Sequence, residues 1–312
     1  MKRFIFTLCL LVSFALLSLS AVAQKVETEG ELFQKISKLT QTKKADDQEK
    51  AYKLSKTYLE RFGKDDSENA KKIKAFVENH EIAKLGKLID DGKTGEAFAF
   101  GKEILATNPE NVVVTMELAL AGLQASEKKK DKSFGKDSID YAKTTLRLFG
   151  ENKAPKTFAP LADQNEATAM MYYIVGVFSA DDNLPEAANN FYKSLQYESK
   201  IKISSLPYIY IALHYHKIYQ NLADEFEKKY ANKPTSDKEA NAANERLGKL
   251  LNLMMDAYAR AAKIGEAQKM EEAANWKGIF TQIYKGVNQS EAGMNEYYDK
   301  ILSQPLPDPS TF

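Results

Sequence analysis

The residues that could bind a metal ion are few and poorly spaced for that task. The chain has three histidines, His80, His214 and His216, and one cysteine, Cys9. Imidazole and thiolate groups hold zinc when three or four of them converge on one point. His214 and His216 stand two positions apart in a predicted helix, so their side chains point to different faces. We therefore expect no metal site.

Paired carboxylates are the next groups that could do chemistry, because two acids at a fixed separation can hydrolyse a glycosidic bond. The pairs Asp90–Asp91 and Asp181–Asp182 fall between predicted helices, where aspartate serves turns and helix caps. The sequence has no glycine-rich phosphate loop, no HExxH zinc motif and no GxSxG nucleophile motif. We expect a non-enzymatic protein without a cofactor, although spacing alone does not exclude an acid pair assembled by folding.

The first residues have the pattern of an export signal. Lys2 and Arg3 make residues 1–3 a basic start, residues 4–19 are almost entirely apolar, and Ala21-Val22-Ala23 has the small-x-small form of a cleavage site. We expect residues 1–23 to be a signal peptide cleaved after Ala23, which would place the protein in the periplasm or outside the cell. An uncleaved anchor is the alternative. A lipid anchor is not favoured, because Cys9 lies deep in the apolar run.

Composition excludes some classes of protein. After cleavage the chain would contain no cysteine and nearly equal numbers of basic and acidic side chains. Without disulfides its stability must come from a buried core, which a chain of this length can form. The charged run at 127–132 mixes lysines with acids, so it predicts a solvated loop, and nothing suggests a nucleic-acid site. No later apolar run approaches the length of a membrane span.

The region 82–111 predicts two helices joined by a tight turn. Apolar residues recur at helical spacing on both sides of the polar turn Asp90-Asp91-Gly92. Thr94 is placed to cap the second helix, and Asn108-Pro109 ends it, because the residue before proline avoids the α region. The two amphipathic helices should pack as an antiparallel pair.

These two helices resemble a tetratricopeptide repeat, whose pattern is W-x2-L-G-x2-Y in the first helix, then A-x3-F-x2-A and a closing proline. The matching residues are Ile82-x2-Leu85-Gly86-x2-Ile89, then Ala97-x3-Gly101-x2-Ile104, with Pro109 after them. A second match is Tyr172-x2-Val175-Gly176 followed by Ala188-x3-Tyr192-x2-Leu195. The resemblance implies an all-α fold, a right-handed superhelical array of antiparallel helix hairpins.

The other periodic segments extend this interpretation along the chain. Tetratricopeptide-like hairpins are expected at 24–149 and 164–303, with a connecting loop at 150–163 as the boundary between two halves and a flexible tail at 304–312. In the second half, the hairpin that follows Asp163 should be succeeded by short helices at 207–217 and 222–230. A long helix from Ser236 to about Ala262 should then pair with one through 267–274, and a last helix is expected at 290–302.

In tetratricopeptide folds the first helices of the hairpins line a concave face, so the resemblance assigns candidate contact residues. They are Lys87, Tyr173, Val177, His216, Asn252 and Asp256. This mixed set suits a protein or peptide better than a small polar substrate. The numerous Tyr and Phe side chains could also line a groove, but core packing is the interpretation that we favour.

The resemblance implies a non-enzymatic scaffold that binds a protein or peptide partner on its concave surface. Two alternatives stay open. One is an envelope glycan- or ligand-binding protein, or an enzyme, on the same helical scaffold; it would need clustered carboxylates or tryptophan platforms, and Trp276 is the only tryptophan. The other is a subunit of an envelope assembly complex, suggested by the pattern Ala51-x6-Tyr58-Leu59-x2-Phe62.

Overall fold

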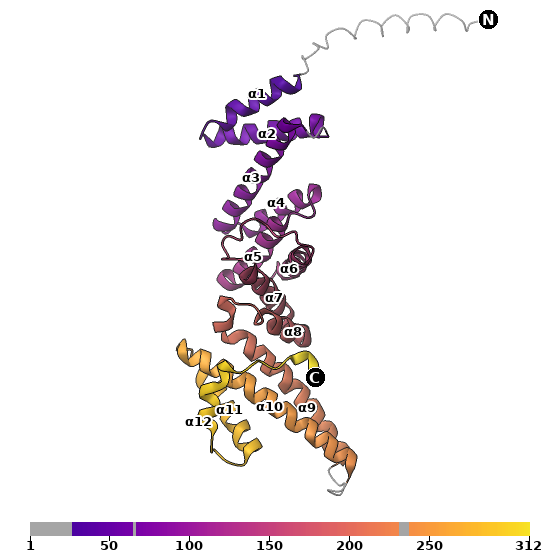
Figure 1. Cartoon of the computed structure of the whole chain (residues 1–312), viewed down its shortest axis with the longest axis vertical. Coiled ribbons are helices and arrows are strands. Elements are labelled where there is room, and N and C mark those ends of the chain that lie inside the picture. The colour runs from indigo at the N-terminus through magenta and orange to yellow at the C-terminus, as the bar shows by residue number, and fades with distance from the viewer. Residues whose placement is uncertain (1–26, 65–66, 231–236) are drawn as a thin grey trace, which may run out of the picture. The chain divides into compact units, whose positions relative to one another are not determined.

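The computed structural model describes residues 27–64, 67–230 and 237–312, which form twelve α-helices and three short 3-10 helices (Figure 1). Within these ranges there is no β-strand, so the all-α class is confirmed. The expected signal peptide at 1–23 and the expected cap Ser236 lie outside them. The α-helices are α1 (Glu29–Thr40), α2 (Ala45–Phe62), α3 (Glu68–Asp90), α4 (Thr94–Thr107), α5 (Val112–Lys129), α6 (Gly135–Gly150), α7 (Gln164–Ser179), α8 (Leu184–Ser194), α9 (Ser205–Tyr230), α10 (Lys238–Ala267), α11 (Ala273–Asn288) and α12 (Met294–Lys300). The 3-10 helices are η1 (Lys200–Ile203), η2 (Ile301–Ser303) and η3 (Pro309–Thr311).

The described residues form two compact units that divide between residues 84 and 85, so the division falls within α3. The expected boundary at 150–163 lies inside the second unit instead. There Phe158 packs edge-on against Phe149 with ring centroids 5.9 Å apart, and Leu161 packs on the same core. The loop does not separate two halves, because α6 and α7 on either side of it pack directly against each other.

The first unit is built from α1, α2 and most of α3. Its α1 begins with a capping box: the Glu31 backbone N–H donates to Thr28 Oγ1 at 3.3 Å, and the Thr28 N–H donates to Glu31 Oε2 at 2.9 Å. The Tyr52 hydroxyl of α2 donates to Glu81 of α3 at 2.8 Å. The buried core residues are Leu32, Ile36, Tyr52, Tyr58, Ala70, Ile73 and Val77.

The second unit starts with the predicted helix pair at 82–111. Leu85 at the end of α3 shares a core with Ala97 and Phe98 of α4 and with Leu118 of α5. Thr94 is the first residue of α4 and not its cap, since Lys93 occupies the cap position without a side-chain bond. The helix ends at Thr107, just before the predicted stop.

The helices α7 and α8 form the predicted hairpin after Asp163. The Asp163 side chain accepts the Glu166 backbone N–H at 2.9 Å, and the Glu166 carboxylate accepts the Ala162 N–H at 2.7 Å. Two donors at the start of α7 are thereby satisfied. Asn183 caps α8 in the same way, with Pro185 in the first turn.

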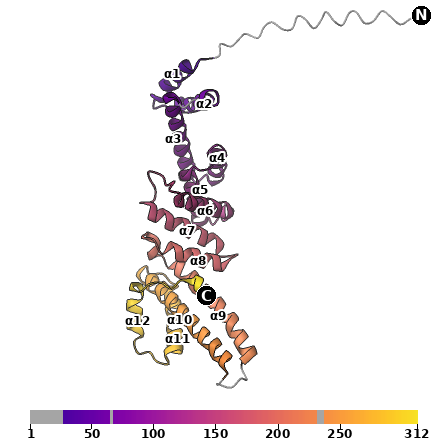
Figure 2. The ribbon, with the colours of Figure 1, turned by 45° about the vertical axis from the view of Figure 1, so that its right-hand side comes forward.

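The predicted helices at 207–217 and 222–230 are one continuous helix, α9, so the predicted turn between them is wrong. The residues at 216–222 contain no glycine or proline that would end a helix. Figures 1 and 2 both show α9 side by side with the long α10, and the two helices pack extensively. The pairing partner of α9 is thus α10, and the two form a single long hairpin.

The predicted helix through 267–274 is also wrong. Helix α10 continues to Ala267, and its partner α11 begins at Ala273. Gly265, inside the last turn of α10, lets α11 come close: a Cβ at this position would lie 2.9 Å from the Trp276 ring. Trp276 therefore packs where α10 and α11 meet.

The residues expected to form a flexible tail, 304–312, instead pack on the core of the second unit. Pro309 is buried, and Leu306 and Phe312 lie against the cluster formed by α7 to α12. The Arg260 guanidinium donates to the Pro305 carbonyl at 3.1 Å. Apolar side chains at both ends of the segment explain the difference, because their burial offsets the entropy of ordering the chain.

Consecutive helices of the second unit pack against each other from α4 to α11. Within the described ranges no helix has the length and apolar character needed to cross a membrane.

Candidate functional site

Helix α5 is nearly enclosed by its neighbours. Val114 and Leu118 pack toward α4, while Met116 and Leu123 pack toward α6 and α7. Before the exposed last turn of α5, only one narrow row at helical spacing of three and four stays partly exposed. This row contains Val113, Glu117, Leu120, Gln124 and Glu127.

Helix α7 carries a similar row. Met170, Tyr173 and Val177 are half-buried and are spaced by three and four residues, so they share one face. All three pack against two core clusters, one with α5 and α6 and one with α8 to α10. The α7 row therefore lies between the core cluster that contains α5 and the core cluster that contains α9.

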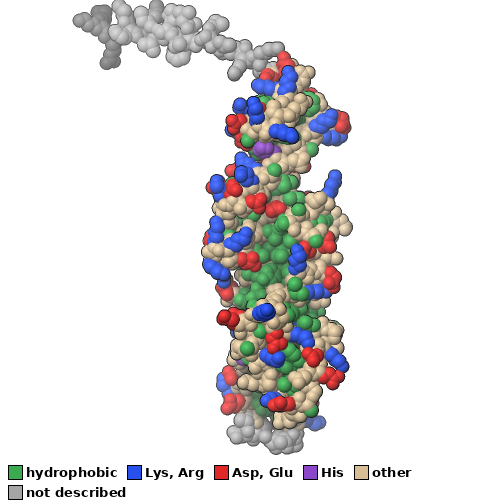
Figure 3. Space-filling model, turned by 90° about the vertical axis from the view of Figure 1, so that its left-hand side faces the viewer, with side chains coloured by type: hydrophobic (Ala, Val, Ile, Leu, Met, Phe, Trp, Pro, Cys, Tyr) green, Lys and Arg blue, Asp and Glu red, His purple; other side chains and the backbone are tan. Residues whose placement is uncertain are grey.

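Helix α9 adds a third row, Leu206, Ile209 and Leu213. Leu213 is 41% exposed, which is unusual for a leucine in a helix with a buried face. We call the three rows together the α5–α7–α9 face. Figure 3 shows a face on which hydrophobic side chains gather at the height of α5 and α7, with charged side chains on either side.

Tyr173 of α7 interacts with one residue at the end of α5 and with another just before α9. Burial raises the pKa of its hydroxyl to about 12, and the nearby Glu127 carboxylate at the end of α5 adds to the rise. A hydrogen bond with Ser204, just before α9, acts in the opposite direction. The Tyr173 ring packs edge-on against Phe191 with centroids 5.7 Å apart. The phenol is therefore neutral and held in place at physiological pH.

Glu117 is the one acid in the middle of the α5 row. Burial raises the pKa of its carboxyl to about 7, and the Asp90 carboxylate at the end of α3 raises it further. Within the described ranges the side chain has no hydrogen bond or ion pair. It is thus a half-buried acid between apolar neighbours, without a counter-charge.

The six candidate contact residues are not one set in the structure. Tyr173 and Val177 lie on the α5–α7–α9 face. Lys87 is exposed on α3 and pairs with Asp91 at 3.4 Å. His216 is half-buried on α9 beside Gln220, and Asn252 is exposed on α10, where its amide donates to the Gly248 carbonyl.

Asp256, the sixth candidate, is a structural residue. It is buried, and its carboxylate binds the Arg260 guanidinium one turn later at 2.6 Å and 3.1 Å. Burial raises the pKa of Asp256, and the bonds from Arg260 oppose that rise. Because Arg260 also holds the Pro305 carbonyl, the pair fixes the chain end and presents nothing to a partner.

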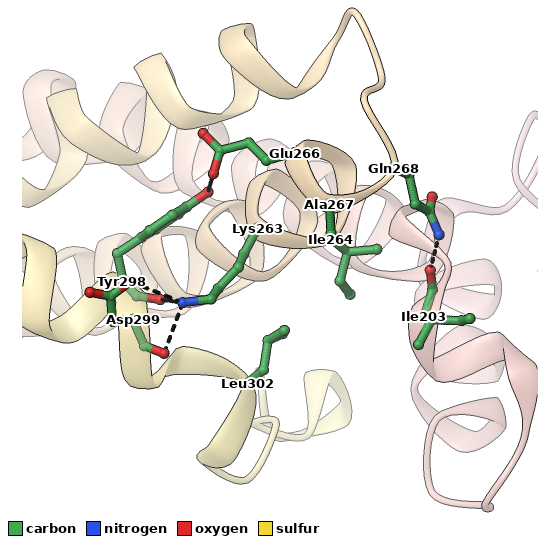
Figure 4. Close-up of a pocket in the computed structure, with 9 residues that line it drawn as sticks. All are labelled: Ile203, Lys263, Ile264, Glu266, Ala267, Gln268, Tyr298, Asp299 and Leu302. Carbon is green, nitrogen blue, oxygen red and sulfur yellow. Dashed lines mark hydrogen bonds and ion pairs between the residues drawn. The ribbon is translucent and has the colours of Figure 1, made fainter.

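A second apolar site is a pocket of about 570 Å³ near the ends of α10 and α12 (Figure 4). Two of the large exposed hydrophobic side chains, Ile203 of η1 and Leu302 of η2, are 64% and 45% exposed and line it. Ile264 and Ala267 of α10 complete its apolar lining.

The polar groups of this pocket bond to one another. Figure 4 shows the Lys263 ammonium reaching Asp299, with contacts of 2.8 Å to the carbonyl and 3.2 Å to the carboxylate. The Tyr298 hydroxyl donates to Glu266 at 2.8 Å. With these groups satisfied, the pocket offers apolar contact and no reactive side chain.

Sequence reasoning missed Glu117 and this pocket. The signal for Glu117 was available, because it is the one charged residue in the apolar run from Val112 to Gln124. The pocket had no such signal, since Ile203 and Leu302 come from segments far apart in the sequence.

The described residues contain no group of three or more His, Cys, Asp or Glu side chains placed to hold a metal ion. Comparison of the chain with protein-family models, with curated proteins and with solved structures gives no match.

Proposed function

We propose that the protein is an exported, non-enzymatic scaffold with a tetratricopeptide-like, right-handed superhelical arrangement of helices. On this proposal it binds a protein or peptide partner on the α5–α7–α9 face. The observation that carries the proposal is the set of partly exposed, mainly apolar rows on α5, on α7 and on the first half of α9, each on a helix with a buried core face. Apolar surface of this kind on a helical array is typical of partner-binding sites.

The chemistry of the face supports a macromolecular partner over a small polar substrate. Most of its side chains are apolar or aromatic, Glu117, Gln124 and Glu127 of α5 being the polar members, and the Tyr173 phenol stays neutral. Among them, a tyrosine such as Tyr173 belongs to the residue types that most often dominate the binding energy of protein–protein contacts.

The test is a photo-crosslinked pull-down with the tagged full chain from the cell envelope of the producing organism, followed by mass spectrometry. Leu213→Asp places a charge on the α5–α7–α9 face. Leu302→Asp makes the same change at a leucine of similar exposure in the other apolar site, and is the matched control. A protein that L213D loses and L302D retains supports the proposal. Capture that survives L213D contradicts it.

A further inference from the structure

Glu117 stands at the centre of the α5 row. Val113 lies four residues before it and Leu120 three residues after it, so both flank the carboxylate on the same face of α5. Each of these neighbours is apolar and packs against the core. Any partner that covers Val113 and Leu120 therefore also covers Glu117.

The charges around Glu117 do not neutralise it. Asp90, the charged group that acts on it, is itself an acid. The lysines on nearby turns are engaged elsewhere: Lys87 pairs with Asp91 at 3.4 Å, and Lys129 donates to the Gly92 carbonyl. The α7 row, which packs on the same core cluster as Val113 and Leu120, contains no charged residue, and neither does the α9 row. The centre of the face is thus an acidic site with apolar side chains on either side of it.

A partner with only apolar groups here would remove the remaining water from the carboxylate without replacing its interactions, which costs free energy. A partner with an acid would add repulsion. A lysine or arginine side chain offers both an aliphatic stem for Val113 and Leu120 and a cation for the carboxylate. The site therefore discriminates between partners by charge.

We propose that the partner segment bound on the α5–α7–α9 face is apolar and basic, and that one of its lysine or arginine side chains pairs with Glu117. This inference rests on the proposed function and names the class of its partner. Asp90 supplies a second acid beside the same position, which favours a cation further.

The direct test needs no knowledge of the partner, because a simple alkylamine mimics the basic side chain. We would titrate methyl-labelled full chain at pH 8 with n-hexylammonium chloride and, separately, with 1-hexanol, and follow the NMR signals of Val113 and Leu120. We expect the amine to bind about tenfold more tightly than the alcohol, as a charge-assisted hydrogen bond predicts. Glu117→Gln should remove that preference, and Glu127→Gln at the exposed end of the row should keep it. Equal binding of amine and alcohol, or no response of these methyl groups, would overturn the inference.

The pull-down separates this inference from the proposed function. If L213D loses the partner and Glu117→Lys also loses it, both stand. If L213D loses the partner but Glu117→Lys captures it as well as the wild type does, the scaffold function stands and the basic partner is wrong. If L213D retains the partner, the proposed function itself has failed.

Discussion

Gly176 of α7 lies directly against the Phe191 ring of α8. A Cβ at Gly176 would be 2.9 Å from two atoms of that ring, which is closer than carbon atoms can approach. The ring cannot move aside easily, because it is fully buried and Tyr173 and Tyr210 pack on it with centroids 5.7 Å and 5.3 Å away. The small residue that the repeat pattern places here thus sets the spacing of the α7–α8 hairpin.

Gly176→Ala should therefore destabilise the protein, by about 1–3 kcal/mol, because overpacking forces the surrounding core to shift. Gly248→Ala is the control. Its added methyl meets no atom within 4 Å, and alanine in a helix is more stable than glycine by up to about 1 kcal/mol. Urea unfolding of both variants measures the difference. Equal stability of G176A and G248A would show that the contact does not constrain the hairpin.

Glu117 should make stability depend on pH. Its pKa rises from 4.5 to about 7 on folding, so the unfolded chain ionises first as the pH increases. The stability that the protonated folded form provides is complete below about pH 4.5 and is lost by about pH 7. Glu117→Gln lacks this loss. At pH 8 it should be more stable than the wild type by about 1–3 kcal/mol, allowing for partial solvent screening.

At pH 4 the same two proteins should be equally stable, since the wild-type carboxyl is then protonated in both states. Thermal unfolding at both pH values, with Glu127→Gln as the control, checks this prediction. A difference between E117Q and wild type that stays constant with pH would exclude a shifted carboxyl.

The buried Asp256–Arg260 pair should be sensitive to the loss of one partner. Asp256→Asn leaves the Arg260 guanidinium buried without its counter-charge, which should cost about 3–5 kcal/mol. Glu296 and Lys300 form a pair of the same spacing on the surface, where Glu296→Gln should cost less than about 0.5 kcal/mol. Denaturant unfolding compares the two variants. Because Arg260 also holds Pro305, D256N should expose the chain end to carboxypeptidase sooner than E296Q does.

The continuity of α9 can be tested with proline. Lys217 is exposed in the middle of this helix, so Lys217→Pro should lose a backbone hydrogen bond and cost about 3 kcal/mol or more. Lys217→Ala keeps that bond and should be close to neutral. Circular dichroism and urea unfolding give both values. If K217P is tolerated as well as K217A, the segment is a turn and α9 is two helices.

Much of the helical order could be predicted, because the interactions that start and stop helices are local. The Thr28 and Asp163 caps, for example, each accept a backbone N–H only three residues away. The turn before Thr94 and the stop at Pro109 are equally short-range. Periodicity over one or two turns was therefore enough to predict the two helices on either side of residues 90–92 and the hairpin after Asp163.

The errors arose where no local signal separates two outcomes. Nothing in the residues at 216–222 decides between a turn and a continuous helix, and packing along α10 selects the helix. The tail has no periodicity, yet Leu306 and Phe312 pack against the core cluster formed by α7 to α12. The repeat pattern predicts that Asp256 is exposed on the first helix of a hairpin. In the structure it is buried and paired with Arg260, which also bonds to the Pro305 carbonyl.

The sequence by itself determined the all-α class, the helix pair around residues 90–92 and the spacing that puts Tyr173 and Val177 on one face of α7, since these follow from hydrogen bonds and spacing within one helix. Only the tertiary structure decided that Glu117 is half-buried without a counter-charge and that Asp256 is buried in an ion pair with Arg260. Burial and charge depend on residues brought together from distant parts of the chain, and no spacing along one helix encodes them.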